Sequence, residues 1–281
     1  MAINNYTLDG VKLLDSQLRW FPDKSSGVRI VPAKRVARIS YPGHDGEYTV
    51  KGASFEPGGV NINLHVRGKT HREFMENKEF IDGLIGQRSK LLRLEHSYDG
   101  KTVDRVAEVE IIASVEPSLR NGRALAAIYN IPCTIPGAFW RSPDTITTPA
   151  YVGTTTDTTH TLPNMGNAPI TDALIRVKGG FSWFHITDPV SDSRLTINKS
   201  VPAANYVIID TTNWSAREVA TNTWSGGTDI SVSVESNRGM GSMFSLEPDV
   251  ASGAMRYRII TRAVSPSTSP AVEVRAKKAY L

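Results

Sequence analysis

The sequence predicts a mainly β protein with one helix, in two parts. Short runs that alternate apolar and polar residues recur in the first half, most regularly over residues 60–66, and such alternation is typical of strands with one buried face. One stretch, residues 70–85, instead carries apolar residues at helical spacing. From residue 167 onward, short strand-like runs alternate with turn residues and no helical pattern occurs. This second half is typical of a β-sandwich of jelly-roll type.

Composition sets outer limits on the class of protein. The 281 residues are 40% hydrophobic and 21% charged, which is ordinary for a soluble globular protein. No apolar run approaches the roughly 20 residues of a membrane-spanning helix, and no secretory signal opens the chain, so we expect a protein made in the cytoplasm that does not insert into membranes. The single cysteine, Cys133, excludes an intramolecular disulfide and is expected to be a small buried apolar side chain.

In the first half, strands are predicted at residues 28–31, 36–41, 48–50 and 60–66, with Pro- and Gly-rich turns between them. A helix follows at about 70–85, where Thr70 and Glu73 fit a capping box. Its buried stripe is predicted to contain Phe74, Ile81, Leu84 and Ile85.

Two hairpins complete the first half. One joins residues 90–95 to 102–112 through Asp99-Gly100, and the next joins 111–115 to 124–131 through Asn121-Gly122. From residue 142 to 166 the composition shifts to Thr, Pro, Asn and Gly, so we expect a domain of residues 1–148, a linker of residues 149–166 and a second domain of residues 167–281. Strands of the second domain are predicted at residues 170–177, 181–186, 194–197, 206–210, 218–220, 230–234, 243–246, 255–261 and 272–277.

The sequence contains no recognisable catalytic constellation. The six histidines lack metal-ligand spacing, and neither a nucleophile elbow nor a phosphate-binding loop is present. We therefore expect no enzymatic activity, no cofactor and no metal site.

Two groups of residues are candidates for binding. Trp183, Trp214 and Trp224, near Phe184, are candidates for a surface that stacks sugars or contacts a partner, although a sandwich core with a loop anchor is the favoured explanation of these aromatic residues. Arg29, Lys34, Arg35 and Arg38 form the densest basic stretch, and because apolar residues alternate with them, a strand with one solvated face is favoured over a DNA-binding patch. The net charge of +4 is mild for a chain of this length.

The order of several motifs resembles a known family. These are the Pro42-Gly43-His44-Asp45-Gly46 turn, the sheet, helix and hairpin order through Leu125, the Ile131-Pro132 and Pro136 to Arg141 segments, Gly166-Asn167-Ala168-Pro169-Ile170, and the run from Tyr206 to Thr212. Together they resemble the distal tail (Dit) proteins of long-tailed, non-contractile phages. The resemblance covers nearly the whole chain, and it rests on order and spacing.

The resemblance implies a structural protein of the virion, placed at the tail tip. It implies an N-terminal β-sandwich domain, similar to a tail-tube subunit, that forms a hexameric ring around a channel for DNA, and a C-terminal sandwich similar to galectins and carbohydrate-binding modules. The implied partners are the tail tube protein, the tip hub protein, the tape measure protein and receptor-binding proteins. In such a ring Arg29, Lys34, Arg35 and Arg38 either face the lumen as a basic collar or belong to an ordinary strand. The alternatives are a carbohydrate-binding module or fibre component used in host attachment, and a plain tail-tube subunit.

Overall fold

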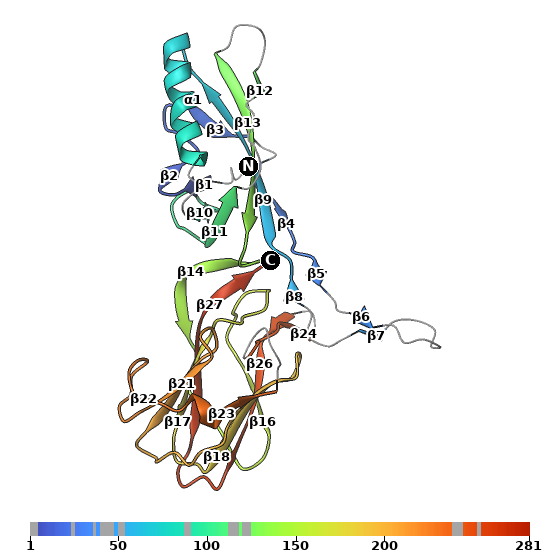
Figure 1. Cartoon of the computed structure of the whole chain (residues 1–281), viewed down its shortest axis with the longest axis vertical. Coiled ribbons are helices and arrows are strands. Elements are labelled where there is room, and N and C mark those ends of the chain that lie inside the picture. The colour runs from blue at the N-terminus through green and yellow to red at the C-terminus, as the bar shows by residue number, and fades with distance from the viewer. Residues whose placement is uncertain are drawn as a thin grey trace. The chain divides into compact units, whose positions relative to one another are not determined.

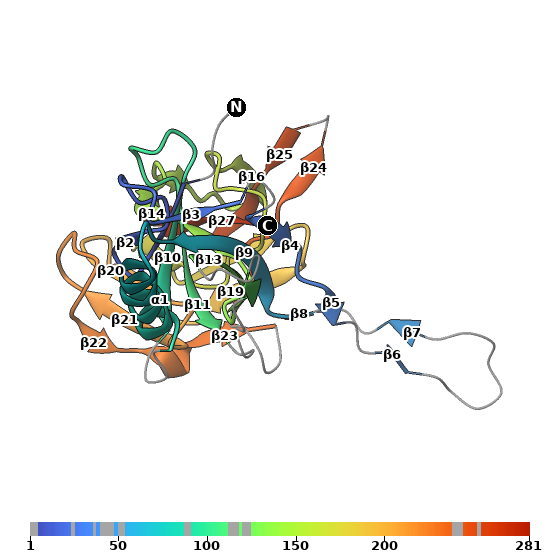
Figure 2. The ribbon, with the colours of Figure 1, turned by 90° about the horizontal axis from the view of Figure 1, so that it is seen from above.

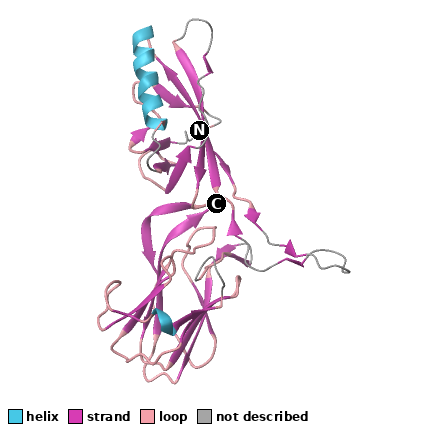
Figure 3. Ribbon diagram, in the orientation of Figure 1, coloured by secondary structure: helices cyan, strands magenta, loops and turns pink. Residues whose placement is uncertain are grey.

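The chain is mainly β with one α-helix, in two compact units (Figures 1 and 3). The first unit is formed by residues 1–143 and residue 281, and the second by residues 144–280. The computed structural model describes residues 5–23, 26–35, 38–39, 48–49, 54–86, 91–111, 118–119, 125–237, 244–251 and 254–281. Among these residues, no helix is long and apolar enough to cross a membrane.

The first unit is built from two groups of antiparallel strands around one core. One group follows the order β2 (Val11–Lys12), β1 (Asn5–Leu8), β10 (Leu92–Ser97), β11 (Arg105–Ile111), and then β14 (Trp140–Thr147), which runs across the boundary between the units. In the other group, β9 (Gly58–Arg67) pairs with β3 (Trp20–Pro22) and β4 (Val28–Ile30) and with β13 (Ala126–Ile135), which also pairs with β12 (Ser118–Leu119). Strand β11 pairs with β13 as well, so it joins the two groups.

The alternation predicted for residues 60–66 is confirmed in β9. Its buried side chains are Val60, Ile62, Leu64 and Val66, all fully inaccessible to solvent. The facing residues of β13 follow the same rule: Tyr129, Ile131 and Cys133 are buried. Period-2 alternation therefore sets which face of each strand enters the core.

The predicted helix is α1 (His71–Ile85), which packs beside β9 (Figure 2). Thr70 caps it as predicted, since its Oγ1 accepts a hydrogen bond from the Glu73 N–H at 3.2 Å. The Glu73 carboxylate accepts from the N–H of Lys69, one residue earlier than a capping box requires. Phe74, Ile81 and Leu84 are buried, whereas Ile85 is only half-buried.

A polar residue completes the buried stripe of α1. Asn77 lies between the turns that carry Phe74 and Ile81, and its Nδ2 donates to the carbonyl of Arg67 at 2.9 Å. From the sheet, the Tyr129 hydroxyl donates to Asp82 of the helix at 2.8 Å. These two bonds fix the helix on strands β9 and β13, in addition to apolar contact.

Two short ribbons continue the β4–β9 pairing. The ribbons are β5 (Lys34–Arg35) with β8 (Ser54–Phe55), and β6 (Arg38–Ile39) with β7 (Tyr48–Thr49). From the Ile30–Gly59 pair to the Lys34–Phe55 pair both limbs advance four residues, so the first ribbon keeps the register of β4 with β9. The turn expected at Pro42 to Gly46 lies outside the described residues.

The second unit is a β-sandwich, as predicted. One sheet runs β27 (Ala271–Tyr280), β17 (Leu174–Lys178), β20 (Tyr206–Asp210), β21 (Ser215–Val219), β22 (Thr228–Asp229), with β15 (Tyr151–Val152) also on β27. The other runs β16 (Thr158–Thr161), β26 (Arg258–Val264), β18 (Trp183–Asp188), β19 (Ser193–Ile197), β23 (Val234–Ser236). A separate hairpin pairs β24 (Asp249–Ala251) with β25 (Ala254–Arg256). The core contains Ile175, Val177, Phe184, Ile186, Leu195, Ile197, Val207, Ile209, Ile259 and Val274.

Two predicted strands of this unit take another form. Residues 231–233 form a short 3-10 helix, η1 (Ser231–Ser233), and β23 starts only at Val234. Within residues 243–246, Leu246 forms an isolated bridge with Ile170. In apolar runs this short, the residue pattern does not distinguish a strand from a tight turn, because the alternation spans too few residues.

The Thr-rich tract at residues 149–166, expected to be a linker, instead contributes to the second sandwich. Strand β15 pairs with β27, and β16 pairs with β26 over four residues. Leu162 and Met165 are buried. The tract lacks an apolar alternation because its strands lie at the edges of the two sheets. At an edge, β-branched threonine favours the strand conformation, and its hydroxyl is solvated or bonded to a neighbouring threonine.

Candidate functional site

The single thiol has a structural role. Cys133 is buried in β13, and burial raises the pKa of its thiol to about 12. The thiol is therefore protonated at neutral pH and does not act as a nucleophile. The expectation of a small buried apolar side chain is confirmed. Among the described residues, no three His, Cys, Asp or Glu side chains gather in a way that could hold a metal ion.

The structure does not bring Trp183, Trp214 and Trp224 together. Trp214 lies in the turn before β21 and Trp224 follows that strand, so the two occupy opposite ends of it. Trp183 belongs to β18 of the other sheet. A single surface made of all three rings is therefore not formed within the second unit.

Trp224 has a structural contact with Arg176 and Arg275. The Arg176 guanidinium lies 4.4 Å from the Trp224 ring centroid, and that of Arg275 lies 5.7 Å away. Arg176, only 6% exposed, also donates to the Glu273 carboxylate at 2.9 Å and 2.5 Å and to the carbonyl of Thr223 at 3.2 Å. These contacts attach the loop after β21 to the sheet.

Trp214 is the most exposed of the three rings. Its side chain is 44% exposed and its backbone φ is 52°, in the left-handed region that residues other than glycine rarely adopt. Asp210 holds this turn by accepting hydrogen bonds from the N–H groups of Thr212 and Asn213.

The four candidate basic residues all lie on the limb that carries β4, β5 and β6. Lys34 and Arg35 are exposed on β5, and Arg35 Nε is 3.4 Å from the Glu56 carboxylate. The Lys34 ammonium lies 5.8 Å from the Phe55 ring centroid. The backbones of Arg29 and Arg38 belong to β4 and β6, but their side chains lie outside the described part of the chain.

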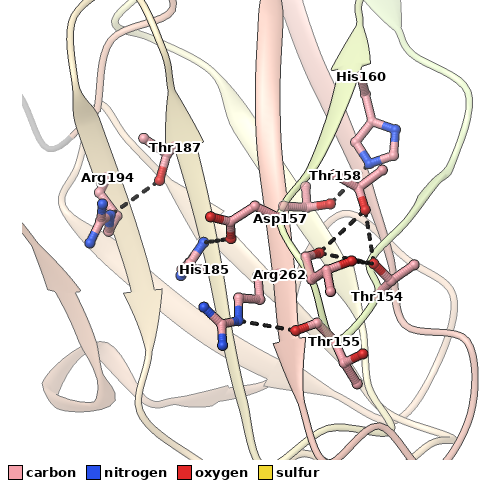
Figure 4. A network of polar contacts seen from close by, with 11 residues as sticks. Thr154, Thr155, Asp157, Thr158, His160, His185, Thr187, Arg194 and Arg262 are labelled. Carbon is pink, nitrogen blue, oxygen red and sulfur yellow. Dashed lines mark hydrogen bonds and ion pairs between the residues drawn. The ribbon is translucent and has the colours of Figure 1, made fainter.

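A network of polar contacts in the second unit lies on the outer face of the sheet that contains β18 (Figure 4). Phe184 and Ile186 point into the core, so Trp183, His185 and Thr187 occupy the other face. Across the ladders, Arg262 of β26 is directly opposite His185, and Arg194 of β19 is directly opposite Thr187. We call Trp183, His185, Arg194 and Arg262 the His185 surface.

The loop before β16 lies against this surface. Asp157 Oδ1 is 3.3 Å from His185 Nε2, and Arg262 Nε donates to the carbonyl of Thr155 at 3.1 Å (Figure 4). The loop is held to β26 by the N–H of Ala263, which donates to the carbonyl of Thr154 at 2.7 Å. Within the loop, the hydroxyls of Thr154 and Thr158 are 2.8 Å apart.

His185 is neutral at physiological pH. Burial lowers its pKa below the ordinary value of 6.5, Asp157 opposes this, and the guanidinium groups of Arg194 and Arg262 lower the pKa further. Its Nδ1 is buried and has no hydrogen-bond partner among the described residues. The ring of Trp183 lies 4.8 Å from that of His185, nearly perpendicular to it.

Sequence reasoning found only Trp183 of this group. Alternation along residues 183–187 is visible in the sequence, and it signals that Trp183, His185 and Thr187 share a face. The positions of Arg194 and Arg262 depend on which strands neighbour β18, and no local pattern carries that information.

Comparison with solved structures shows a likeness over nearly the whole chain. The Dit protein (gp 19.1) of phage SPP1, described as a paradigm of the hub adsorption apparatus in phages that infect Gram-positive bacteria, superposes with a TM-score of 0.59. The match covers 99% of this chain and 100% of that one, at 15% sequence identity. No protein-family model and no curated protein sequence matches the chain. The chain therefore has a Dit-like fold.

Proposed function

We propose that this protein is a structural component of a phage tail tip, which forms a six-membered ring that joins the tail tube to the tip and lets DNA pass. The observation that carries the proposal is the fold likeness to a hub adsorption protein, which extends through both units in the same chain order. A single β-sandwich occurs in many unrelated proteins. The combination of two particular units along one whole chain is far more specific.

The two ribbons of the first unit support assembly into an oligomer. Among the described strands, β5 and β8 pair only with each other, as do β6 and β7. Isolated two-stranded ribbons are marginally stable in water. Ile30 and Val31, at the base of these ribbons, are 53% and 62% exposed. A neighbouring subunit that covers this limb would bury the apolar side chains, and the head-to-tail contacts of a cyclic ring present such a neighbour to every subunit.

In this proposal the first unit forms the ring and the second unit projects from it. The division falls near residue 143, where the two compact units meet in the sequence. The partners are the tail tube protein on one side and the tip hub protein on the other, with the tape measure protein and receptor-binding proteins as further contacts. The protein has no catalytic role and is carried in the virion at the tail tip.

Mass photometry and negative-stain microscopy of the purified full chain test the ring. We expect particles of six subunits with a central hole at micromolar concentration, or on addition of tail tubes. Ile30→Asp with Val31→Asp should reduce the hexamer, since charge at these positions opposes their burial. Val232→Asp in the second unit is the matched control, because Val232 is 99% exposed. A protein that stays monomeric and also fails to bind tail tubes would exclude the proposal.

A further inference from the structure

We propose that the His185 surface binds an anionic saccharide, a sugar unit that carries a carboxylate or a phosphate. The inference goes beyond the proposed role in the tail tip. It concerns only the second unit and holds for a single chain or for a ring.

The first argument is the state of the two arginines. Arg194 donates through Nε to the Thr187 hydroxyl at 3.2 Å, and Arg262 donates through Nε to the carbonyl of Thr155. Among the described residues, their Nη groups have no hydrogen-bond partner and no carboxylate lies within ion-pair distance. Each guanidinium group is therefore held by one hydrogen bond through Nε, and its Nη donors face solvent.

The second argument is their spacing. Arg194 and Arg262 lie on the two strands that flank β18, opposite Thr187 and His185, so they are offset by two residues along it. At about 5 Å between strands and about 3.4 Å per residue, the two backbones are about 10 Å apart across the sheet and about 7 Å apart along it. Between them, the side chains of His185 and Thr187 are buried. The long Arg194 and Arg262 side chains therefore lie on either side of a shallower area formed by His185 and Thr187. The planar guanidinium fork matches carboxylate and phosphate oxygens, so one acidic group can receive charge-assisted bonds from both.

The third argument is that side chains able to contact the ring and the hydroxyls of a sugar lie next to the two arginines. Trp183 lies two residues from His185 on the same face, and its half-buried indole offers an apolar ring surface. Val264, opposite Trp183 on β26, is exposed and extends the apolar area. On the other side, the exposed Asp157 carboxylate and the hydroxyls of the Thr-rich loop can bond sugar hydroxyls.

The acidic neighbours limit the ligand to one anionic group. The Asp157 carboxylate lies against His185, 3.3 Å from its Nε2, and Glu235 of β23 is opposite Thr196 of β19, the strand that carries Arg194. The positive charge is therefore confined between two carboxylates. A nucleic acid needs a row of cations along its backbone, and this surface does not provide one.

Ligand-observed NMR titration of the full chain tests the proposal, with glucuronic acid, glucose 6-phosphate, glucose and inorganic phosphate as probes. We expect at least one acidic sugar to bind about tenfold more tightly than glucose and than phosphate, because only it uses both the arginines and the indole. The comparison of glucuronic acid with glucose 6-phosphate shows whether the carboxylate or the phosphate is preferred.

Three variants assign the contacts. Arg194→Ala, which leaves the Arg262 bond to the loop intact, should abolish the preference for acidic sugars over glucose. Trp183→Ala should reduce the binding of the acidic sugar to that of inorganic phosphate. Arg217→Ala, which removes an exposed arginine of the other sheet, is the control and should bind as the unmodified chain does. Thermal melts verify that each variant is folded.

Four results would overturn the proposal. The first is no saturation transfer to either acidic sugar at any concentration in the titration. The second is glucose bound as tightly as the acidic sugars. The third is binding that Arg194→Ala leaves unchanged in a folded protein. The fourth is a short DNA duplex that displaces glucose 6-phosphate at a lower concentration than glucuronic acid does.

Discussion

At the scale of single residues, the second unit contains two arginine sites with opposite roles. Arg176 is buried, and each of its described contacts is with this chain: Glu273, the carbonyl of Thr223 and the rings of Trp224 and Tyr206. Arg194 and Arg262 are exposed and use only Nε. A buried charge needs internal partners because it has lost water, whereas the remaining donors of an exposed one are solvated by water.

Removal of either partner of the buried ion pair should destabilise the second unit. Arg176→Ala or Glu273→Ala leaves a charge without its partner in a largely buried site, which costs about 3–5 kcal/mol of unfolding free energy. Urea denaturation followed by tryptophan fluorescence measures the loss. Arg217→Ala, at an exposed position of the same sheet, should change stability little. An unchanged urea midpoint for Arg176→Ala would mean that the pair is not needed for folding.

Stability should fall on the acid side because of His185. Its folded-state pKa lies below the unfolded value of 6.5, so the unfolded chain binds the proton first as the pH falls. Below pH 6.5 the unfolding free energy therefore decreases, by up to about 1.4 kcal/mol per pH unit for one proton. The decrease ends once the folded state is protonated as well.

In His185→Gln this part of the pH dependence should be absent. Urea melts at about pH 7.5 and about pH 5.5 measure it as the difference in unfolding free energy between the two conditions. His71→Gln, at an exposed position of α1, is the control. Equal pH dependence in His185→Gln and in the unmodified chain would contradict the prediction.

At the scale of elements, helix α1 shows how a local signal and tertiary packing combine. Its start is set locally, by the Thr70 cap. Its orientation is set by the sheet, through Phe74, Ile81 and Leu84 and through the bonds of Asn77 and Asp82. Phe80 remains 47% exposed and stacks on Trp20 at 5.0 Å.

Substitutions in α1 should separate these contributions. Ile81→Ala or Leu84→Ala should cost about 2–5 kcal/mol, since each leaves a cavity against the sheet. Thr70→Ala should cost about 1 kcal/mol through loss of the cap. Met75→Ala, on the exposed side of the helix, is the control. Thermal melts in which the apolar variants match Met75→Ala would show that the buried stripe does not contribute to stability.

At the scale of the whole molecule, the decisive feature is that residues 144–166 belong to the second sandwich. Strands β15 and β16 and the buried Leu162 and Met165 all lie within them. A domain boundary placed at residue 167 from composition alone would remove from the second unit an edge strand of each sheet and part of the core.

The two possible fragments should therefore differ. Residues 144–281 should fold as an all-β domain with a cooperative thermal transition. Residues 167–281 should be less stable or unfolded, because β26 loses the neighbouring strand β16 and becomes an open sheet edge, and the core loses Leu162. Circular dichroism of both fragments measures their strand content and their melting temperatures. Equal melting temperatures would show that the tract contributes nothing to the domain.

Several features were predictable from the sequence because their causes are local. The alternation of residues 60–66 specifies which face of β9 is buried, and the helical spacing from Phe74 to Leu84 specifies the buried face of α1. The solitary Cys133 in an apolar run implies a buried thiol. The mainly β class follows from the same patterns, and the order of motifs resembles Dit proteins, whose fold the structure shows.

The rest was decided by tertiary structure because it depends on which strands become neighbours. The threonines of residues 154–161 give no apolar alternation, and only pairing with β26 makes them part of a sandwich. Trp183, Trp214 and Trp224 look equivalent in the sequence, but their surroundings differ. Trp183 belongs to the His185 surface, Trp214 lies in an exposed turn, and Trp224 packs on the buried Arg176. Arg194 and Arg262 are 68 residues apart in the sequence and flank the same strand. Hydrogen bonding between distant strands creates that proximity, and a local pattern does not encode it.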